Sequence, residues 1–159
     1  MNPTIQGLHS TIRGLLLAGA AIVLCSFFVT PARASERWET LEAIHWIENP
    51  HDSARPGPFG ELGAYQFRQS TWRSYTTAPF SRAVDRQASD DVAIKHYEWL
   101  KRGLVRNGVA VTPYNIALAW NGGLTATVRG SVPASARDYA ERVTNVVTEL
   151  RQGRVASAR

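Results

Sequence analysis

Apolar residues recur every three or four positions in five stretches of the chain, and alternation of apolar and polar residues never lasts more than a few positions. The first pattern is typical of helices that bury one face, whereas the second would indicate half-buried strands. The spacing predicts helices over residues 36–48, 84–106 and 114–120, a short helix after Ser70, and a last helix from Ser135 to about Leu150. We therefore expect one mainly α domain without internal repeats.

Proline, glycine and capping residues separate the expected helices. Residues 51–60 are rich in proline and glycine and should form a loop, and the aromatic segment 63–67 could form an extended turn or a very small hairpin strand. The expected caps and stops are Ser70, Asn107–Gly108, Thr112–Pro113, the Asn-Gly-Gly at 121–123, and Ser135. Residues 124–133 are expected to be a loop.

Helical spacing also assigns places to several large side chains. Trp38, Trp72 and Trp99 are expected in the core, and Trp46 should project away from the buried stripe of the first helix. His45 lies near the edge of that stripe. Because no second histidine or carboxylate lies at a metal-ligand spacing from it, we expect a structural histidine with satisfied hydrogen bonds.

Residues 1–34 have the pattern of a secretory signal peptide. Residues 14–29 are almost wholly apolar, and Ala32-Arg33-Ala34 has the small-x-small form of a cleavage site. The apolar run is shorter than the about 20 residues that span a bilayer, so we expect cleavage after Ala34 and no stable membrane insertion. The sequence predicts a periplasmic or secreted protein with one domain over residues 35–150 and a disordered basic tail over 151–159.

Composition narrows the choice of partners. Cleavage would leave 125 residues with 16 basic and 13 acidic side chains, a net charge of +3. This modest charge suits an anionic wall polymer and is too small for a nucleic-acid-binding protein. The single cysteine, Cys25, lies in the signal segment, so we expect no disulfide, metal or cofactor. A domain of this length can bury about two-thirds of its unfolded surface as a monomer.

The candidate chemistry centres on Glu48, at the end of the first helix. At about 100° per residue, Leu41, Ile44 and Glu48 lie within about 60° of one another, so a carboxyl occupies the apolar stripe. Asn49-Pro50 must end the helix there. Burial and the negative end of the helix dipole both disfavour the anion, and a carboxyl that keeps its proton can act as a general acid. The alternative is a glutamate on a frayed last turn that faces water or pairs with an arginine.

Four segments, in this order, resemble the lysozyme-like superfamily, in particular its lytic transglycosylase, goose-type lysozyme and resuscitation-promoting-factor-like branches. They are Glu48-Asn49-Pro50, where those families have Glu-Ser-Gly, then Gly-Ala-Tyr-Gln-Phe-Arg-Gln-Ser-Thr-Trp at 63–72, Ala-Leu-Ala-Trp-Asn-Gly-Gly at 117–123, and the Tyr-x-x-x-Val at 139–143. The resemblance extends from Trp38 to Val147. The chain departs from the pattern at Asn49-Pro50, which removes a hydroxyl that can steady the carboxyl, and at Trp120, which replaces a tyrosine.

The resemblance implies a lysozyme-like α domain that cleaves the β-1,4 bond between N-acetylmuramic acid and N-acetylglucosamine in peptidoglycan. Glu48 would protonate the leaving glycosidic oxygen, and the positive charge on the sugar ring must then be met. In lytic transglycosylases the N-acetyl oxygen of the substrate attacks, and a 1,6-anhydro sugar leaves. In hydrolytic relatives a second carboxylate activates water. Glu61 is the better-placed candidate for this carboxylate, although it could be a solvated loop residue, and Asp52 could simply form an Asx turn.

The remaining candidate residues would bind the sugar. The Gln66 amide can donate to and accept from an N-acetyl group, or it can satisfy a backbone group in its own turn. Asn121 could bind substrate or could act only as a helix stop. Tyr65, Trp120 and Tyr139 offer ring faces or a hydroxyl to the sugar or to the catalytic carboxyl, and Tyr139 could instead belong to the core.

A second function is compatible with the same sequence. The altered residues after Glu48 and the missing tyrosine at position 120 are compatible with a non-catalytic peptidoglycan-binding or cell-wall assembly module on the same fold. Saturable binding without product would identify such a module, whereas turnover would exclude it. A nucleic-acid partner is not expected, because a signal peptide directs the chain away from nucleic acid.

Overall fold

The computed structural model describes the backbone of residues 31–157 and the side chains of residues 36–154. The elements are α1 (Pro31–Glu48), α2 (Gln69–Arg73), the 3₁₀ helix η1 (Phe80–Val84), α3 (Arg86–Arg106), α4 (Pro113–Gly122), α5 (Leu124–Val128) and α6 (Ala134–Ser157). The prediction of a mainly α protein is confirmed. Within the described residues the only β pairing is an isolated bridge between Leu62 and Phe67, so the segment 63–67 is a tight turn closed by one bridge.

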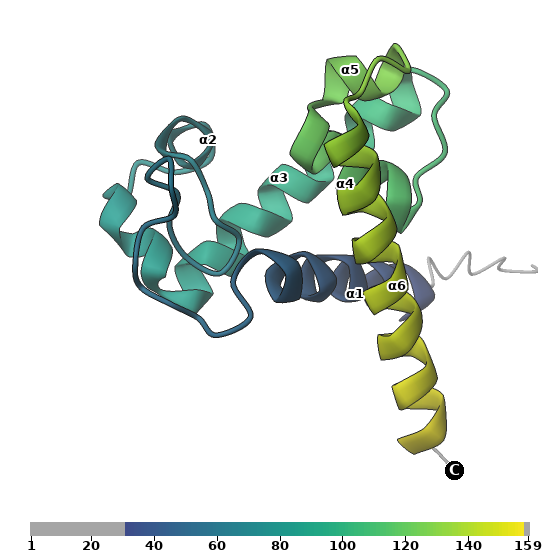
Figure 1. Ribbon diagram of the computed structural model, residues 1–159, viewed down its shortest axis with the longest axis horizontal. Helices are drawn as coiled ribbons and strands as arrows, with labels where there is room; N and C mark the ends of the chain where they lie inside the picture. The colour runs from purple at the N-terminus through teal and green to yellow at the C-terminus, as the bar shows by residue number, and fades with distance from the viewer. Residues whose placement is uncertain (1–30, 158–159) are drawn as a thin grey trace, which may run out of the picture.

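The helix α3 links two ends of the molecule, and the other elements are arranged along it (Figure 1). α2, η1 and the loop that follows α1 lie at one end of α3, while α4 and α5 lie at the other. α6 packs most extensively on α4 and also crosses α1. Because α1 runs toward the loop-rich end, its last residue, Glu48, lies beside the loop and turn of residues 49–68.

The core lies where α1, α3, α4 and α6 meet. Ile44, Leu100, Ile116 and Val143, one from each of these helices, are fully buried. Burying a side chain of this size stabilises the folded state by about 1.5–3 kcal/mol. The contacts hold the four helices as one body, and they fix the end of α1 relative to α4 and α6.

The helix signals around α3 and α4 act as predicted. The Thr112 side chain caps α4 by accepting a hydrogen bond from the amide of Asn115, and Pro113 occupies the first helical position. Asn107 is the C-cap of α3, and Gly108 follows it with a positive φ of 69°. Glycine adopts this left-handed conformation without steric cost, so the chain can turn sharply toward α4.

Two predicted caps are wrong. Ser70 lies inside α2, which begins after Arg68, and Ser135 lies inside α6, which begins at Ala134. The capping residue that sequence reasoning missed is Asp85, whose side chain accepts a hydrogen bond from the amide of Ala88 at 2.8 Å. Because this cap starts α3 at Arg86, Val84, the first residue of the predicted long helix, is instead the last residue of η1.

The expected loop over residues 124–133 is also wrong in part, because it contains α5. Leu124, the first residue of α5, packs against Gly103 of α3, where any Cβ would overlap the leucine side chain. The missing side chain at Gly103 therefore leaves room for a short helix that the local sequence of residues 124–128 does not indicate.

The predicted disordered tail over 151–159 is wrong for residues 151–157, which continue α6. Arg151 and Arg154 both pair with the carboxylate of Glu39, and the distance from Arg151 Nε to Glu39 Oε2 is 2.6 Å. Glu39 is only 3% exposed, and a buried carboxylate requires such charged partners. The two arginines are part of the packing between α6 and α1.

The tryptophans that are buried are only partly those that the sequence predicted. Trp72 is buried and donates to the carbonyl of Ala78, and Trp46 is exposed, as expected for both. Trp38 and Trp99 were expected in the core but are 50% and 41% exposed. The Arg154 guanidinium lies 5.3 Å from the Trp38 ring centroid, so a cation from α6 partly covers this ring in place of apolar side chains.

Most of the predicted signal peptide lies outside the described residues. The helix α1 begins at Pro31, earlier than the predicted start at residue 36, and so includes the last part of the 1–34 segment. The cleavage after Ala34 stays a prediction. None of the described helices is both long enough and apolar enough to cross a bilayer.

Candidate active site

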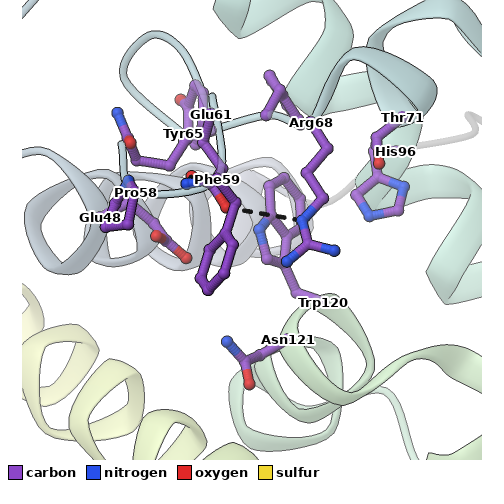
Figure 2. A pocket seen from close by; sticks show the side chains of 12 residues that line it. Glu48, Pro58, Phe59, Glu61, Tyr65, Arg68, Thr71, His96, Trp120 and Asn121 are labelled. Carbon is purple, nitrogen blue, oxygen red and sulfur yellow. Dashed lines mark hydrogen bonds and ion pairs between the residues drawn. The ribbon is translucent and has the colours of Figure 1, made fainter. Parts of the chain in front are cut away.

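A groove of about 550 Å³ lies between the end of α1, the loop-rich segment, α3 and α4 (Figure 2). Its lining residues are Glu48, Pro58, Phe59, Glu61, Tyr65, Gln66, Phe67, Arg68, Thr71, His96, Trp120 and Asn121. The size is within the range of sites for small organic ligands. The groove brings together six of the seven residues that the sequence singled out as a site, and only Tyr139 lies behind its wall.

Glu48 is half-buried at the last turn of α1, and the helix does not fray before it. The amide of Asn49 still donates to the carbonyl of His45 at 2.8 Å, which completes the turn around the glutamate. Burial raises the pKa of the Glu48 carboxyl, and the nearby charge of Glu61 also raises it. Tyr139 and Arg142 lower this pKa, but the net direction is upward. A proton is therefore retained on Glu48 above the ordinary range for glutamate.

Tyr139 supports Glu48 from inside the protein. It is 4% exposed, and its hydroxyl has no hydrogen-bond partner among the described residues, but it lies near enough to the Glu48 carboxyl for each group to shift the pKa of the other. Burial first, and then the neighbouring Glu48, raise the pKa of Tyr139 well above its ordinary value. The hydroxyl stays protonated and can donate to the anionic form of Glu48. Tyr139 thus belongs to the core and also contacts the carboxyl.

Asn49 has a role that sequence reasoning missed. Its side chain is buried, donates to the carbonyls of Ser53 and Gly63 at 3.0 and 3.2 Å, and accepts from the amide of Ser53 at 2.9 Å. Asn49 therefore ties the segment after Glu48 to the turn at residues 63–67. An asparagine directly between a helix end and a proline was the available signal for this bracing role.

Glu61 lines the same groove with its side chain only 13% exposed, so it is not a solvated loop residue. Burial raises the pKa of Glu61, but hydrogen bonds from its own backbone amide and that of Phe59, together with the Arg68 charge, outweigh burial and lower it. The Phe59 amide donates to Oε2 at 2.9 Å, and Arg68 Nε lies 3.6 Å from Oε1. Glu61 is thus an anion facing the groove.

The Gln66 turn has an unusual backbone. Gln66 has a positive φ of 44°, and its Nε2 donates to the carbonyl of Gly63 at 3.0 Å, so the amide does satisfy its own turn. The side chain also lines the groove and lies beside Gly57, where a Cβ would come 2.7 Å from Gln66 Oε1. Gly63 has a φ of 81°, and a Cβ there would overlap the carbonyl of Ala83.

Tyr65 lines the groove, but its hydroxyl does not face substrate or Glu48. The hydroxyl donates to Asp90 Oδ1 at 2.6 Å, on the far side of the turn. Burial and the Asp90 carboxylate raise the pKa of Tyr65, so the phenol stays protonated. The expectation of a hydroxyl contact to the sugar or to Glu48 is therefore wrong for Tyr65.

The last two predicted residues project from the end of α4 (Figure 2). Trp120 is half-buried, and its ring centroid lies 5.8 Å from that of Phe67 and 4.6 Å from that of His96. Asn121 is exposed and still helical, and Gly123, with a φ of 86°, is the C-cap. Because Gly123 provides the helix stop, the Asn121 side chain is available to the groove.

Asp52, the less favoured second carboxylate, is not among the residues that line the groove. It accepts a hydrogen bond from the proton-bearing Nε2 of His45 at 3.0 Å, because Arg86 donates to the other ring nitrogen, Nδ1, at 2.9 Å. Arg86 also contacts Glu42 Oε2 and Asp90 Oδ1, each at 2.9 Å. The prediction of a buried, fully partnered His45 is confirmed, and this network fixes the segment that follows Glu48.

His96 lines the groove and was not singled out from the sequence. The hydroxyl of Tyr75 lies 2.8 Å from His96 Nδ1, and burial lowers the pKa of His96 to about 4. The ring is therefore neutral near pH 7. The available signal was a histidine three residues before Trp99 on the helix predicted over residues 84–106. Among the described residues, no group of three His, Cys, Asp or Glu side chains could hold a metal ion.

Comparison with known proteins gives no relative. No protein-family model matches the chain, and neither a curated protein nor a solved structure matches it. The lysozyme-like resemblance therefore stays a prediction that depends on the four segments and on the geometry of the groove.

Proposed function

We propose that this chain cleaves peptidoglycan glycan strands at the β-1,4 bond between N-acetylmuramic acid and N-acetylglucosamine, with Glu48 as the general acid. One observation carries the proposal: two carboxyls, Glu48 with a raised pKa and Glu61 with a lowered pKa, line one groove. Acid-assisted glycosidic cleavage uses carboxyls whose environments separate their pKa values in this way. The four-segment resemblance supports the same function on a lysozyme-like fold, in the periplasm or outside the cell.

The rest of the groove suits a sugar. A pyranose has apolar ring faces and a polar rim, and the groove offers the ring of Trp120 together with the amides of Gln66 and Asn121. Amides can both donate to and accept from an N-acetyl group. The polymer substrate also agrees with the modest positive charge of the chain.

The proposed reaction is a lytic transglycosylation in two steps. Glu48 transfers its proton to the glycosidic oxygen, the bond from that oxygen to C1 of N-acetylmuramic acid breaks, and the N-acetyl oxygen of that sugar attacks C1. Glu48, now a carboxylate, takes the proton of the C6 hydroxyl, whose oxygen then displaces the N-acetyl oxygen at C1. The products are a 1,6-anhydro sugar and a free 4-hydroxyl. Tyr139 stabilises the Glu48 anion between the two steps.

Glu61 is assigned an electrostatic role in this scheme. Its Oε2 already accepts the Phe59 amide, and its Oε1 faces Arg68, so both oxygens have partners. These partners lower the pKa of Glu61 and so make it a weaker base for activating water. An anion held in place can instead stabilise the positive charge that develops on the sugar ring. This difference favours transglycosylation over hydrolysis.

The test is product analysis on purified cell-wall sacculi by mass spectrometry. The protein should release muropeptides with 1,6-anhydro ends, and Glu48→Gln should reduce the rate by about 10²–10⁴-fold, the usual contribution of a general acid. Glu149→Gln is the matched control, since this exposed glutamate of α6 lies outside the groove. Equal release by Glu48→Gln would overturn the assignment of Glu48.

The same experiment separates the alternatives. Reducing ends in place of 1,6-anhydro ends would assign hydrolysis and make Glu61 the base. Saturable binding to sacculi without any product would identify the non-catalytic wall-binding module instead. Absence of both binding and product would overturn the assignment of peptidoglycan as the partner.

A further inference from the structure

A second pocket of about 410 Å³ adjoins the groove on the side away from Glu48. It is lined by Ser70, Thr71, Ser74, Tyr75, His96 and Trp99. Thr71 and His96 line both the pocket and the groove, so the two spaces share a wall and follow one another across α2 and α3. We call this space the α3 pocket.

Trp99 gives the α3 pocket an aromatic surface that the core does not use. Its side chain is 41% exposed, although large apolar side chains at helical spacing are normally buried. One face is stacked on His96, with the ring centroids 5.9 Å apart and the planes 12° from parallel. The stacking holds the indole at a fixed angle beside the pocket.

The polar groups of the α3 pocket lie around this surface. Ser70 of α2 and Ser74, the C-cap of that helix, are exposed, and the Ser74 hydroxyl donates to the carbonyl of Ser70 at 3.0 Å, which leaves its oxygen free to accept. His96 uses Nδ1 toward Tyr75, and its Nε2 has no partner among the described residues. An apolar ring with hydroxyls and an imidazole nitrogen at its edge matches the two chemical faces of a pyranose.

We propose that the α3 pocket is a further sugar-binding subsite, in which Trp99 packs against a pyranose unit of the same glycan strand that passes Glu48. The proposal rests on the proposed function, because it extends the groove assigned to that strand. Continuity of the two spaces through Thr71 and His96 favours a chain over a separate small ligand. A strand that occupied both would contact α1 and α4 at one end and α3 at the other.

Length-dependent binding tests the proposal. The probes are peptide-free glycan oligomers of alternating N-acetylglucosamine and N-acetylmuramic acid, as di-, tetra- and hexasaccharides, measured by calorimetry in the Glu48→Gln background to prevent turnover. We expect Trp99→Ala to weaken hexasaccharide binding by about 5- to 10-fold, in line with the energy of an aromatic contact, and to leave disaccharide binding unchanged. Trp46→Ala, which removes an exposed tryptophan outside both spaces, should change neither.

A second variant tests the space without removing the tryptophan. Ser70→Leu places a larger apolar side chain at the edge of the α3 pocket, and it should abolish the advantage of long oligomers in the same way. If either variant binds all lengths as the background protein does, or loses affinity equally at every length, the subsite is overturned. Length-dependent binding by a parent protein that releases no product would overturn the proposed cleavage while supporting the subsite. No binding at any length would overturn both.

Discussion

Arg86 should contribute more to stability than an arginine with a single exposed ion pair, because three partners from two helices converge on it. Its guanidinium contacts Glu42, His45 and Asp90, each at 2.9 Å, and its side chain is 39% exposed. Hydrogen bonds to charged groups are worth about 1.5–3 kcal/mol when buried, whereas exposed ion pairs contribute about 0.2–1 kcal/mol. At this partial exposure we assign about 1 kcal/mol to each contact, or about 3 kcal/mol in total.

The perturbation is Arg86→Met, which keeps an unbranched stem and removes the guanidinium. Thermal unfolding followed by circular dichroism should show Tm lower by about 10 °C, since about 1 kcal/mol corresponds to about 3–4 °C in a domain of this size. Arg82→Met is the matched control: its ion pair with Asp85 is 3.4 Å long and lies between more exposed side chains, so Tm should change by less than about 2 °C. Similar small shifts in both variants would refute the conclusion that the Arg86 network stabilises the fold.

The ionisation of the two carboxyls leads to three further predictions. The rate of product release should follow a bell-shaped pH profile. On the alkaline side the rate falls as Glu48 loses its proton, at a pH above the ordinary glutamate range. On the acid side the rate falls as Glu61 gains a proton, at a pH below that range. Rates measured on sacculi across pH would contradict this if the alkaline limb lay near 4.5, the ordinary pKa of a glutamate. Tyr139→Phe removes a group that lowers the pKa of Glu48, so the alkaline limb should move to higher pH, and an unmoved limb would exclude their interaction. The folded state holds the Glu48 proton more tightly than the unfolded state, so stability is lost as pH rises through the raised pKa. Glu48→Gln has no carboxyl to ionise and should therefore unfold at a higher temperature than the parent at pH 7. The difference in unfolding temperature should vanish below pH 4.5.

The sequence predicted the parts of the fold that local rules determine. Thr112 and Gly108 act within a few residues of themselves, and the structure has both as expected. The place of Glu48 followed from helical angle alone, because neighbours one turn apart on a helix share a face. The same rule placed Trp99 in the core wrongly, because Trp99 lies at the edge of the apolar stripe of α3, beyond the part of that helix that packs against the core.

Features that depend on distant partners could not be predicted in this way. Glu39 and Arg151 are 112 residues apart in sequence, and nothing near either residue indicates that they meet. Residues 151–157 are helical where composition alone favoured disorder, and this contact joins that part of α6 to α1. Likewise, the sequence does not indicate that the Tyr65 hydroxyl binds Asp90, because Asp90 lies 25 residues further along the chain.

The contact between Gly63 and Ala83 limits how this protein can be altered or can diverge. Two main chains touch there, and no exchange of side chains elsewhere can restore the space that a methyl group at position 63 would take. The turn that contains Gln66 and the η1 segment must consequently keep their relative positions, both in related sequences and when the site is transferred to another protein. A saturation library at this codon, selected for folded protein, should return glycine alone, because any Cβ would overlap the Ala83 carbonyl and the positive φ adds backbone strain.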